Sequence, residues 1–188
     1  MEFFASLENS ALSTWIRESN SILAYDLFLI SHAIGMAIVV GLSAAFALRL
    51  LGFAEDLPLA PMEKFFPLMY AGFWINAASG VVLFVTYPVR AVTNLGFYLK
   101  MGSVALAMVA LVRLRRLVFR HRATLDKAPV PANAKTLAGA LLFFWWAAVL
   151  AGRLLAYHGI ANVELQATIA VSAASALMLL ARYAIARS

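Results

Sequence analysis

One histidine stands alone in an apolar stretch near the start of the chain. Residues 28–47 read LFLISHAIGMAIVVGLSAAF, and His32 is the only ionisable side chain among them. An ionisable group in hydrocarbon is costly and is usually retained for a task. A neutral imidazole can coordinate a metal or form hydrogen bonds across a helix bundle. Both roles are open for His32, and its position in the middle of an apolar run favours the ligand.

Five further polar side chains lie within or at the ends of later apolar runs: Asn76, Lys100, Arg153, Tyr157 and His158. Lys100 can extend its amine to the membrane surface, or ligate iron as a buried neutral amine. Arg153 and Tyr157 are four residues apart on one helical face, which suits either a carboxylate or a lipid headgroup. His158 precedes Gly159 and is expected to end its helix, with a metal ligand as its second interpretation.

A haem would explain why His, Lys and Arg converge in an apolar bundle. Its iron takes an imidazole nitrogen, its ring lies against apolar and small residues, and its propionates pair with Arg or Lys near water. Gly72, Asn76 and Gly80 form a small and polar stripe at four-residue spacing. For the two glycines we favour close helix packing over a cofactor wall, with Asn76 as an interhelical hydrogen-bonding residue.

The elements that must hold these residues are membrane-spanning helices. The chain of 188 residues is 64% hydrophobic and 13% charged, with a mean hydropathy of +0.86. Because about 20 helical residues cross a bilayer, the sequence predicts five spans and an all-α integral membrane bundle. The predicted spans are 22–52, 63–88, 95–117, 136–158 and 162–186.

Charge and cysteine content narrow the possible functions. The chain has no cysteine, which excludes disulfides, zinc–thiolate sites and iron–sulfur clusters. Its net charge of +6 is concentrated in one loop, residues 113–135, which places that loop in the cytoplasm by the positive-inside rule. The amino terminus is then periplasmic and the carboxyl terminus cytoplasmic. Phe119 is the one Phe, Tyr or Trp in this loop, so there is no pattern of interleaved aromatic residues, and we expect contact with lipid and no nucleic-acid partner.

The first twenty residues differ from the rest. The segment 1–20 lacks a basic region and a cleavage site, so it does not read as a signal peptide. Its larger apolar residues gather loosely on one helical face, which predicts a short helix lying on the membrane surface. These residues are Phe3, Phe4, Leu7, Leu12, Trp15 and Ile16. We expect this interfacial segment to precede a single transmembrane domain over 21–188.

Three stretches carry a resemblance to a known family. They are SHAIGMAIVVGLSAAFALRLLG, MEKFFPLMYAGFWINAASGVVLF and FYLKMGSVALAMVALVRLRR. In order and spacing they resemble the core of the HemJ and CopD group of small bacterial membrane proteins, over about residues 22–118. That core has a His early in the first span, a Met-Glu entry to the second and a Lys early in the third. HemJ-like members are haem-b-binding protoporphyrinogen oxidases, and CopD-like members are associated with copper uptake.

The resemblance implies haem b as cofactor and His32 with Lys100 as axial ligands. It also implies a bacterial inner-membrane location. From the residues themselves, we keep His158 as the reserve ligand. The chain departs from HemJ-like proteins at two places. They have a Trp followed by a small residue and Gly where this chain has Val39–Gly41, and they tend to have His where it has Arg113–Arg116. We therefore expect a haem-binding electron carrier, with porphyrinogen oxidation as a further possibility and no catalytic residue assigned. The alternative is a cofactor-free transport or scaffolding subunit of a larger membrane complex, or a homo-oligomer, with a role connected to copper.

Overall fold

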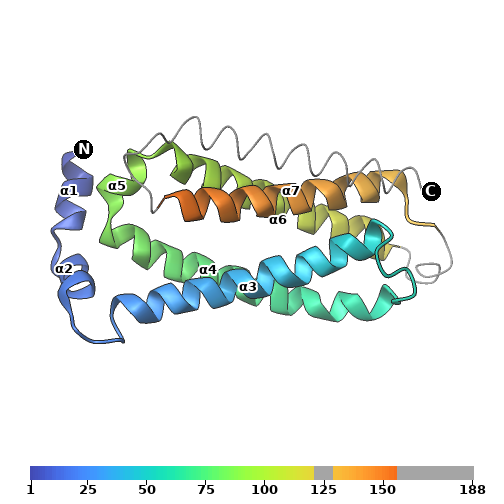
Figure 1. Ribbon diagram of the computed structural model, residues 1–188, viewed down its shortest axis with the longest axis horizontal. Coiled ribbons are helices and arrows are strands. Elements are labelled where there is room, and N and C mark those ends of the chain that lie inside the picture. Colours follow the sequence, from blue (N-terminus) through green and yellow to red (C-terminus); the bar gives the residue numbers. More distant parts are fainter. Residues whose placement is uncertain (121–128, 156–188) are drawn as a thin grey trace. The chain divides into compact units, whose positions relative to one another are not determined.

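The computed structural model describes residues 1–120 and 129–155, and in these ranges all of the regular secondary structure is helical (Figure 1). Four helices are long and apolar enough to cross a membrane: α3 (Tyr25–Leu50), η1 with α4 (Ala60–Thr86), α6 (Leu95–Val118) and α7 (Ala132–Leu154). They match the first four predicted spans to within a few residues at most ends. The fifth predicted span lies outside the described residues.

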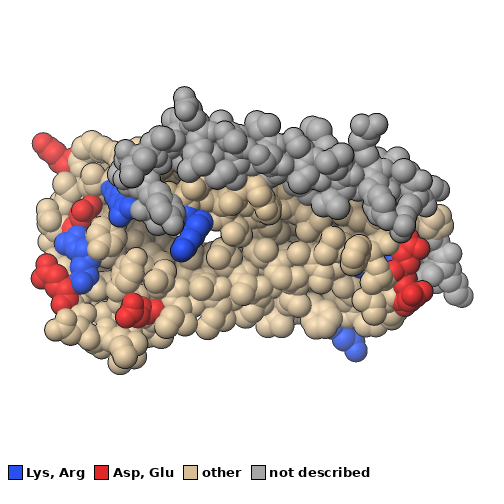
Figure 2. All heavy atoms as spheres, viewed as in Figure 1, with Lys and Arg blue, Asp and Glu red and all other residues tan. Residues whose placement is uncertain are grey.

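The surfaces of these helices are those of a protein in lipid. Many large apolar side chains on α3, α4 and α6 are exposed, among them Ile30, Ile34, Trp74 and Val109. Figure 2 shows that charged side chains are few on the face in view and that most lie near the ends of helices. A water-soluble protein rarely exposes so much contiguous apolar surface. The described part of the chain is therefore a helical membrane protein.

The chain forms two compact units. The first comprises residues 1–41 and 66–95, and holds α1 (Glu2–Glu8), α2 (Ala11–Glu18), most of α3, α4 and α5 (Pro88–Val92). The second comprises 42–65 and 96–188, and holds the end of α3, η1 (Ala60–Phe65), α6 and α7. Its buried side chains include Phe46, Leu111 and Leu141.

Local chemistry sets where the long helices end. Gly52 follows α3 with φ of +95°, and Phe53 N–H donates to Leu48 O at 2.9 Å. Together with the Gly52 N–H bond to Arg49 O, this is the arrangement by which a glycine in the left-handed region closes a helix. In the first unit, α4 (Phe66–Thr86) ends just before Pro88, which has no N–H to continue the helix.

The amino-terminal segment differs from its predicted form. It folds as two short helices, α1 and α2, where one was predicted, because Asn9 interrupts the helix and the Ser10 hydroxyl accepts from Ser13 N–H to begin α2. The predicted apolar face is divided as well. Ile16 is buried, whereas Phe3, Leu12 and Trp15 are exposed.

Candidate functional site

His32 lies against α4 in the first unit. Its Nδ1 is 2.9 Å from the backbone oxygen of Asn76 and 3.2 Å from the Ser79 hydroxyl. Toward the amino end of α3, Tyr25 pairs with Tyr87 at 6.4 Å between ring centroids, so α3 and α4 are antiparallel. Because both partners of Nδ1 belong to α4, the imidazole points toward that helix.

The contact between the two helices is reciprocal. Asn76 Nδ2 donates to the backbone oxygen of His32 at 2.7 Å, while the His32 ring bonds to the backbone oxygen of Asn76. Each residue thus offers a side chain to the main chain of the other. The structure confirms Asn76 as an interhelical hydrogen-bonding residue.

These partners determine which nitrogen of the neutral His32 ring carries the proton. A backbone oxygen can only accept, so Nδ1 must donate its hydrogen to Asn76 O. Ser79 donates its own hydroxyl hydrogen to Ile75 O at 2.7 Å, which leaves its oxygen to accept from Nδ1 as well. The lone pair of the neutral ring then falls on Nε2. Metal-bound histidines are commonly oriented in this way, by a hydrogen bond from the other ring nitrogen to a carbonyl.

Glycines bring the two backbones close enough for these bonds. A Cβ placed on Gly35 would lie 2.6 Å from Asn76 N and 2.7 Å from Gly72 O, both main-chain atoms. A Cβ on Gly72 would lie 2.8 Å from Ile38, and one on Gly80 would lie 3.1 Å from Cε1 of His32. Close helix packing, the interpretation favoured for Gly72 and Gly80, is what the contacts show. Gly80 in addition makes room for the imidazole.

Lys100 belongs to the second unit, where its side chain lies along α7. A Cβ on Gly152 would meet Lys100 Cδ at 3.4 Å and Nζ at 3.7 Å. Gly152 is close to the carboxyl end of α7 (Ala132–Leu154), so the Lys100 side chain packs near that end of the helix. Arg153 is the next residue along and is exposed.

The predicted site residues are thus distributed over the chain. The structure brings His32 and Asn76 into direct contact in the first unit and describes Lys100 and Arg153 in the second. Tyr157 and His158 lie outside the described residues. Within residues 1–120 and 129–155, no three His, Asp or Glu side chains come together as a metal-binding group.

The sequence did not single out Ser79 as part of this arrangement. Ser79 is 4% exposed and bonds to the His32 ring. The spacing of residues could have identified Ser79, because it lies about one turn beyond Asn76 and next to Gly80 on the same small and polar stripe.

No protein-family model, curated protein or solved structure matches the chain. The resemblance to the HemJ and CopD group therefore remains a prediction that rests on the quoted stretches of sequence.

Proposed function

We propose that this chain is a haem-b-binding redox protein of the bacterial inner membrane, in which His32 supplies the first axial ligand through Nε2. The observation that carries the proposal is the hydrogen bond from His32 Nδ1 to Asn76 O, because it assigns the lone pair to Nε2. When bound, haem iron supplies a one-electron couple. The proposed function is electron transfer, and HemJ-like porphyrinogen oxidation is its enzymatic form.

The donor set fits a porphyrin better than a bare metal ion. A bare ion needs several protein ligands, and the part of the chain that the structure describes contains no group of three His, Asp or Glu. A porphyrin brings four ring nitrogens and asks the protein only for axial donors. The chain has no cysteine thiolate to serve in that position, so imidazole and amine nitrogens are the strongest donors it offers.

The remaining roles extend the same proposal. Asn76 and Ser79 would hold the imidazole in position from α4. Lys100 would be the second ligand with His158 in reserve, Arg153 would pair with a propionate, and Tyr157 would add a hydrogen bond. The full bundle would have five spans, with the amino terminus periplasmic and the carboxyl terminus cytoplasmic.

A second candidate is a cofactor-free transport or scaffolding subunit, connected to copper or to a partner in a larger complex. It is supported by the reciprocal bonds between His32 and Asn76, which stabilise the α3–α4 contact whether or not a metal is present. Under this alternative, the imidazole serves packing alone.

Haem reconstitution separates the two candidates. The chain is purified in nanodiscs, incubated with haem, freed of excess by size exclusion, and measured by reduced-minus-oxidised difference spectroscopy. We expect a stoichiometric haem signal that is lost in His32→Ala and kept in the matched control His121→Ala, whose histidine lies in the predicted loop. Thermal unfolding of His32→Ala checks that the variant is folded, and imidazole added to His32→Gly should restore the signal.

Two results would overturn the haem proposal. One is a colourless wild-type chain after reconstitution, which would favour the cofactor-free subunit. The other is a His32→Ala variant that is folded and binds as much haem as the wild type.

A further inference from the structure

The amino-terminal helices lie across one end of the first unit. Figure 1 shows α1 and α2 crossing the end where α3 begins and α4 stops. Helix α1 contacts α4 and α5, and α2 contacts α4. The place they occupy is the break between α4 and α5, where Pro88 interrupts the helix and leaves backbone groups without helical partners.

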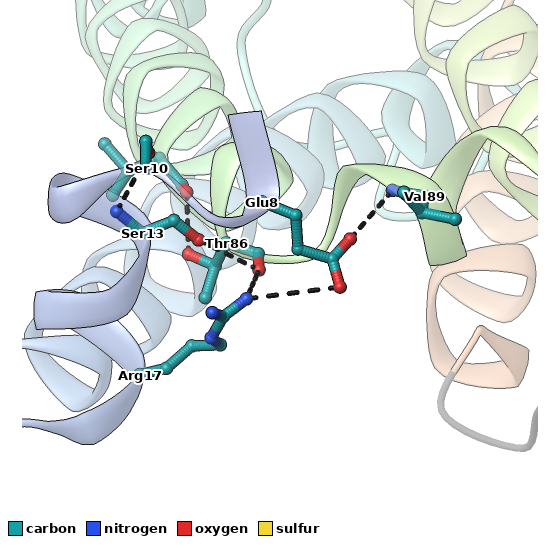
Figure 3. A network of polar contacts seen from close by, with 7 residues as sticks. Glu8, Ser10, Ser13, Arg17, Thr86 and Val89 are labelled. Carbon is teal, nitrogen blue, oxygen red and sulfur yellow. Dashed lines mark hydrogen bonds and ion pairs between the residues drawn. The ribbon is translucent and has the colours of Figure 1, made fainter. Parts of the chain in front are cut away.

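Polar side chains of α1 and α2 satisfy those backbone groups (Figure 3). Ser13 Oγ and Arg17 Nη1 both donate to Thr86 O, at 3.3 and 3.2 Å. Glu8 Oε2 accepts from Val89 N–H at 3.2 Å, in the first turn of α5. An ion pair of 4.0 Å joins Arg17 to Glu8. The segment is therefore held at the α4–α5 break by hydrogen bonds and charge.

The face of α2 that meets the protein is its polar one. Ser13 is fully buried, Arg17 is half-buried, and Ile16 is the one large apolar side chain of α2 that is buried. Leu12 and Trp15 point away, with 58% and 53% of their surfaces exposed. A helix that packs on a protein in water normally shows the reverse distribution.

Exposed apolar side chains also follow α2 along the chain, up to and into the first candidate membrane span. Ile22 and Leu23, in the short link to α3, are more exposed than any large apolar residue of α3. They are followed along the chain by Leu27 and Ile30, which are exposed on the span itself. On α1, Phe3 is exposed as well. Exposed large apolar side chains thus occur on α1, on α2, in the link and on α3, with the exposed polar residues Asn20 and Asp26 between them.

We propose that α1 and α2 form an interfacial anchor, in which Phe3, Leu12 and Trp15 insert into the bilayer surface at the amino-terminal end of α3. The hydrogen bonds of Ser13 and Arg17 to Thr86 O and of Val89 N–H to Glu8 hold this anchor on the α4–α5 break. Aromatic and aliphatic side chains are the ones that such helices place at the boundary between headgroups and acyl chains.

The charges of the segment bear on whether it prefers neutral or anionic lipid headgroups. Glu2 and Glu18 are exposed, and the one basic side chain of the segment, Arg17, is paired with Glu8. The anchor therefore gains nothing from anionic headgroups, and apolar burial drives its insertion. Its depth should be the same in neutral and anionic bilayers.

Spin labelling tests the anchor directly, because a chain without cysteine can be labelled at one introduced position. Leu12→Cys is labelled in phosphatidylcholine vesicles, with and without phosphatidylglycerol, and its collisions with oxygen and with a water-soluble nickel chelate are compared. The control is Asp56→Cys, in an exposed turn. We expect oxygen to be favoured several-fold at position 12 in both lipid mixtures, and nickel to be favoured at position 56.

Each other outcome contradicts the anchor. Nickel access at position 12 equal to that at position 56 would place α2 in water. Protection from both reagents would mean that a second copy or another protein covers this face. Deeper insertion with phosphatidylglycerol would show that attraction to anionic lipid drives binding.

A second variant tests the polar attachment. Arg17→Gln, made in the Leu12→Cys background, removes the contacts to Glu8 and weakens the bond to Thr86 O. We expect higher mobility of the label and loss of its preference for oxygen. The matched control is Glu18→Gln, which removes an exposed charge from the same helix and should change neither quantity. Equal behaviour of the two variants would contradict the role of Arg17.

Discussion

The glycines at the α3–α4 crossing of the first unit differ from the helical glycines of the second unit in what surrounds them. In the first, a Cβ on Gly35 would lie 2.6 Å from a main-chain nitrogen of α4, so the helices meet backbone to backbone. In the second, a Cβ on Gly102 or Gly139 would have no neighbour within 4 Å among the residues that the structure describes, and among these residues one on Gly152 would meet only the flexible end of Lys100. Close backbone contact is therefore confined to the α3–α4 crossing among these glycines. That is also where Asn76 and His32 exchange hydrogen bonds, which need such an approach.

Gly35→Ala should break this contrast most strongly. The added methyl group has main-chain atoms on two sides, so α3 and α4 must separate, and the bonds between His32 and Asn76 lengthen. We expect a loss of about 2–3 kcal/mol in the free energy of unfolding, in the range seen for overpacked interiors. Unfolding in mixed micelles with increasing dodecyl sulfate measures it.

The matched control for that variant is Gly41→Ala, on the same helix. Among residues 1–120 and 129–155, a Cβ at Gly41 has no neighbour within 4 Å, so we expect the change to act through helix propensity, with a gain of up to about 1 kcal/mol. Equal effects of the two substitutions would contradict a backbone contact at Gly35.

Asn76→Leu should have the next largest effect. It removes the 2.7 Å bond to His32 O but keeps the backbone oxygen to which the imidazole donates. We expect a loss of roughly 0.6–1.7 kcal/mol, between the average and the largest value from double-mutant cycles on hydrogen bonds between membrane helices. The same titration measures it, and Ser79→Ala, which removes the longer 3.2 Å contact, should cost less. A stability equal to that of the wild type would show that the bond is not formed.

Gly152→Ala should have the smallest effect of the three. The new methyl group would touch Lys100 Cδ at 3.4 Å, an ordinary contact with a side chain that can move. We expect a change between zero and a gain of about 1 kcal/mol, from helix propensity alone. A loss as large as that of Gly35→Ala would show that α7 has a tight contact of its own and would remove the contrast between the units.

Much of this architecture could be predicted from the sequence. Long apolar runs determine spanning helices, so four predicted spans correspond to helices of the described chain. The small and polar stripe around Asn76 indicated helix packing, because small residues at four-residue spacing share one face. Gly52, at the end of the first predicted span, also carried its own signal as a helix terminator.

Other features depend on contacts that composition does not encode. The His32 ring donates to the backbone oxygen of Asn76. Every residue has such an oxygen, so residue type does not predict which one accepts the hydrogen bond. The division of the amino-terminal apolar cluster depends on where α4 breaks, because Arg17 and Ser13 turn toward Thr86 O and leave Trp15 outside. The haem, its second ligand and the family resemblance remain predictions.

The central claim is that the α3–α4 crossing protonates His32 on Nδ1 and leaves the lone pair on Nε2. Nitrogen NMR of histidine-labelled protein tests it directly in the variant His121→Gln/His158→Gln, where His32 is the only histidine left. The account predicts a neutral His32 ring with its proton on Nδ1 in this double variant. It predicts the same when Asn76→Leu is added to the double variant. A ring protonated on Nε2, or on both nitrogens at neutral pH, would contradict it.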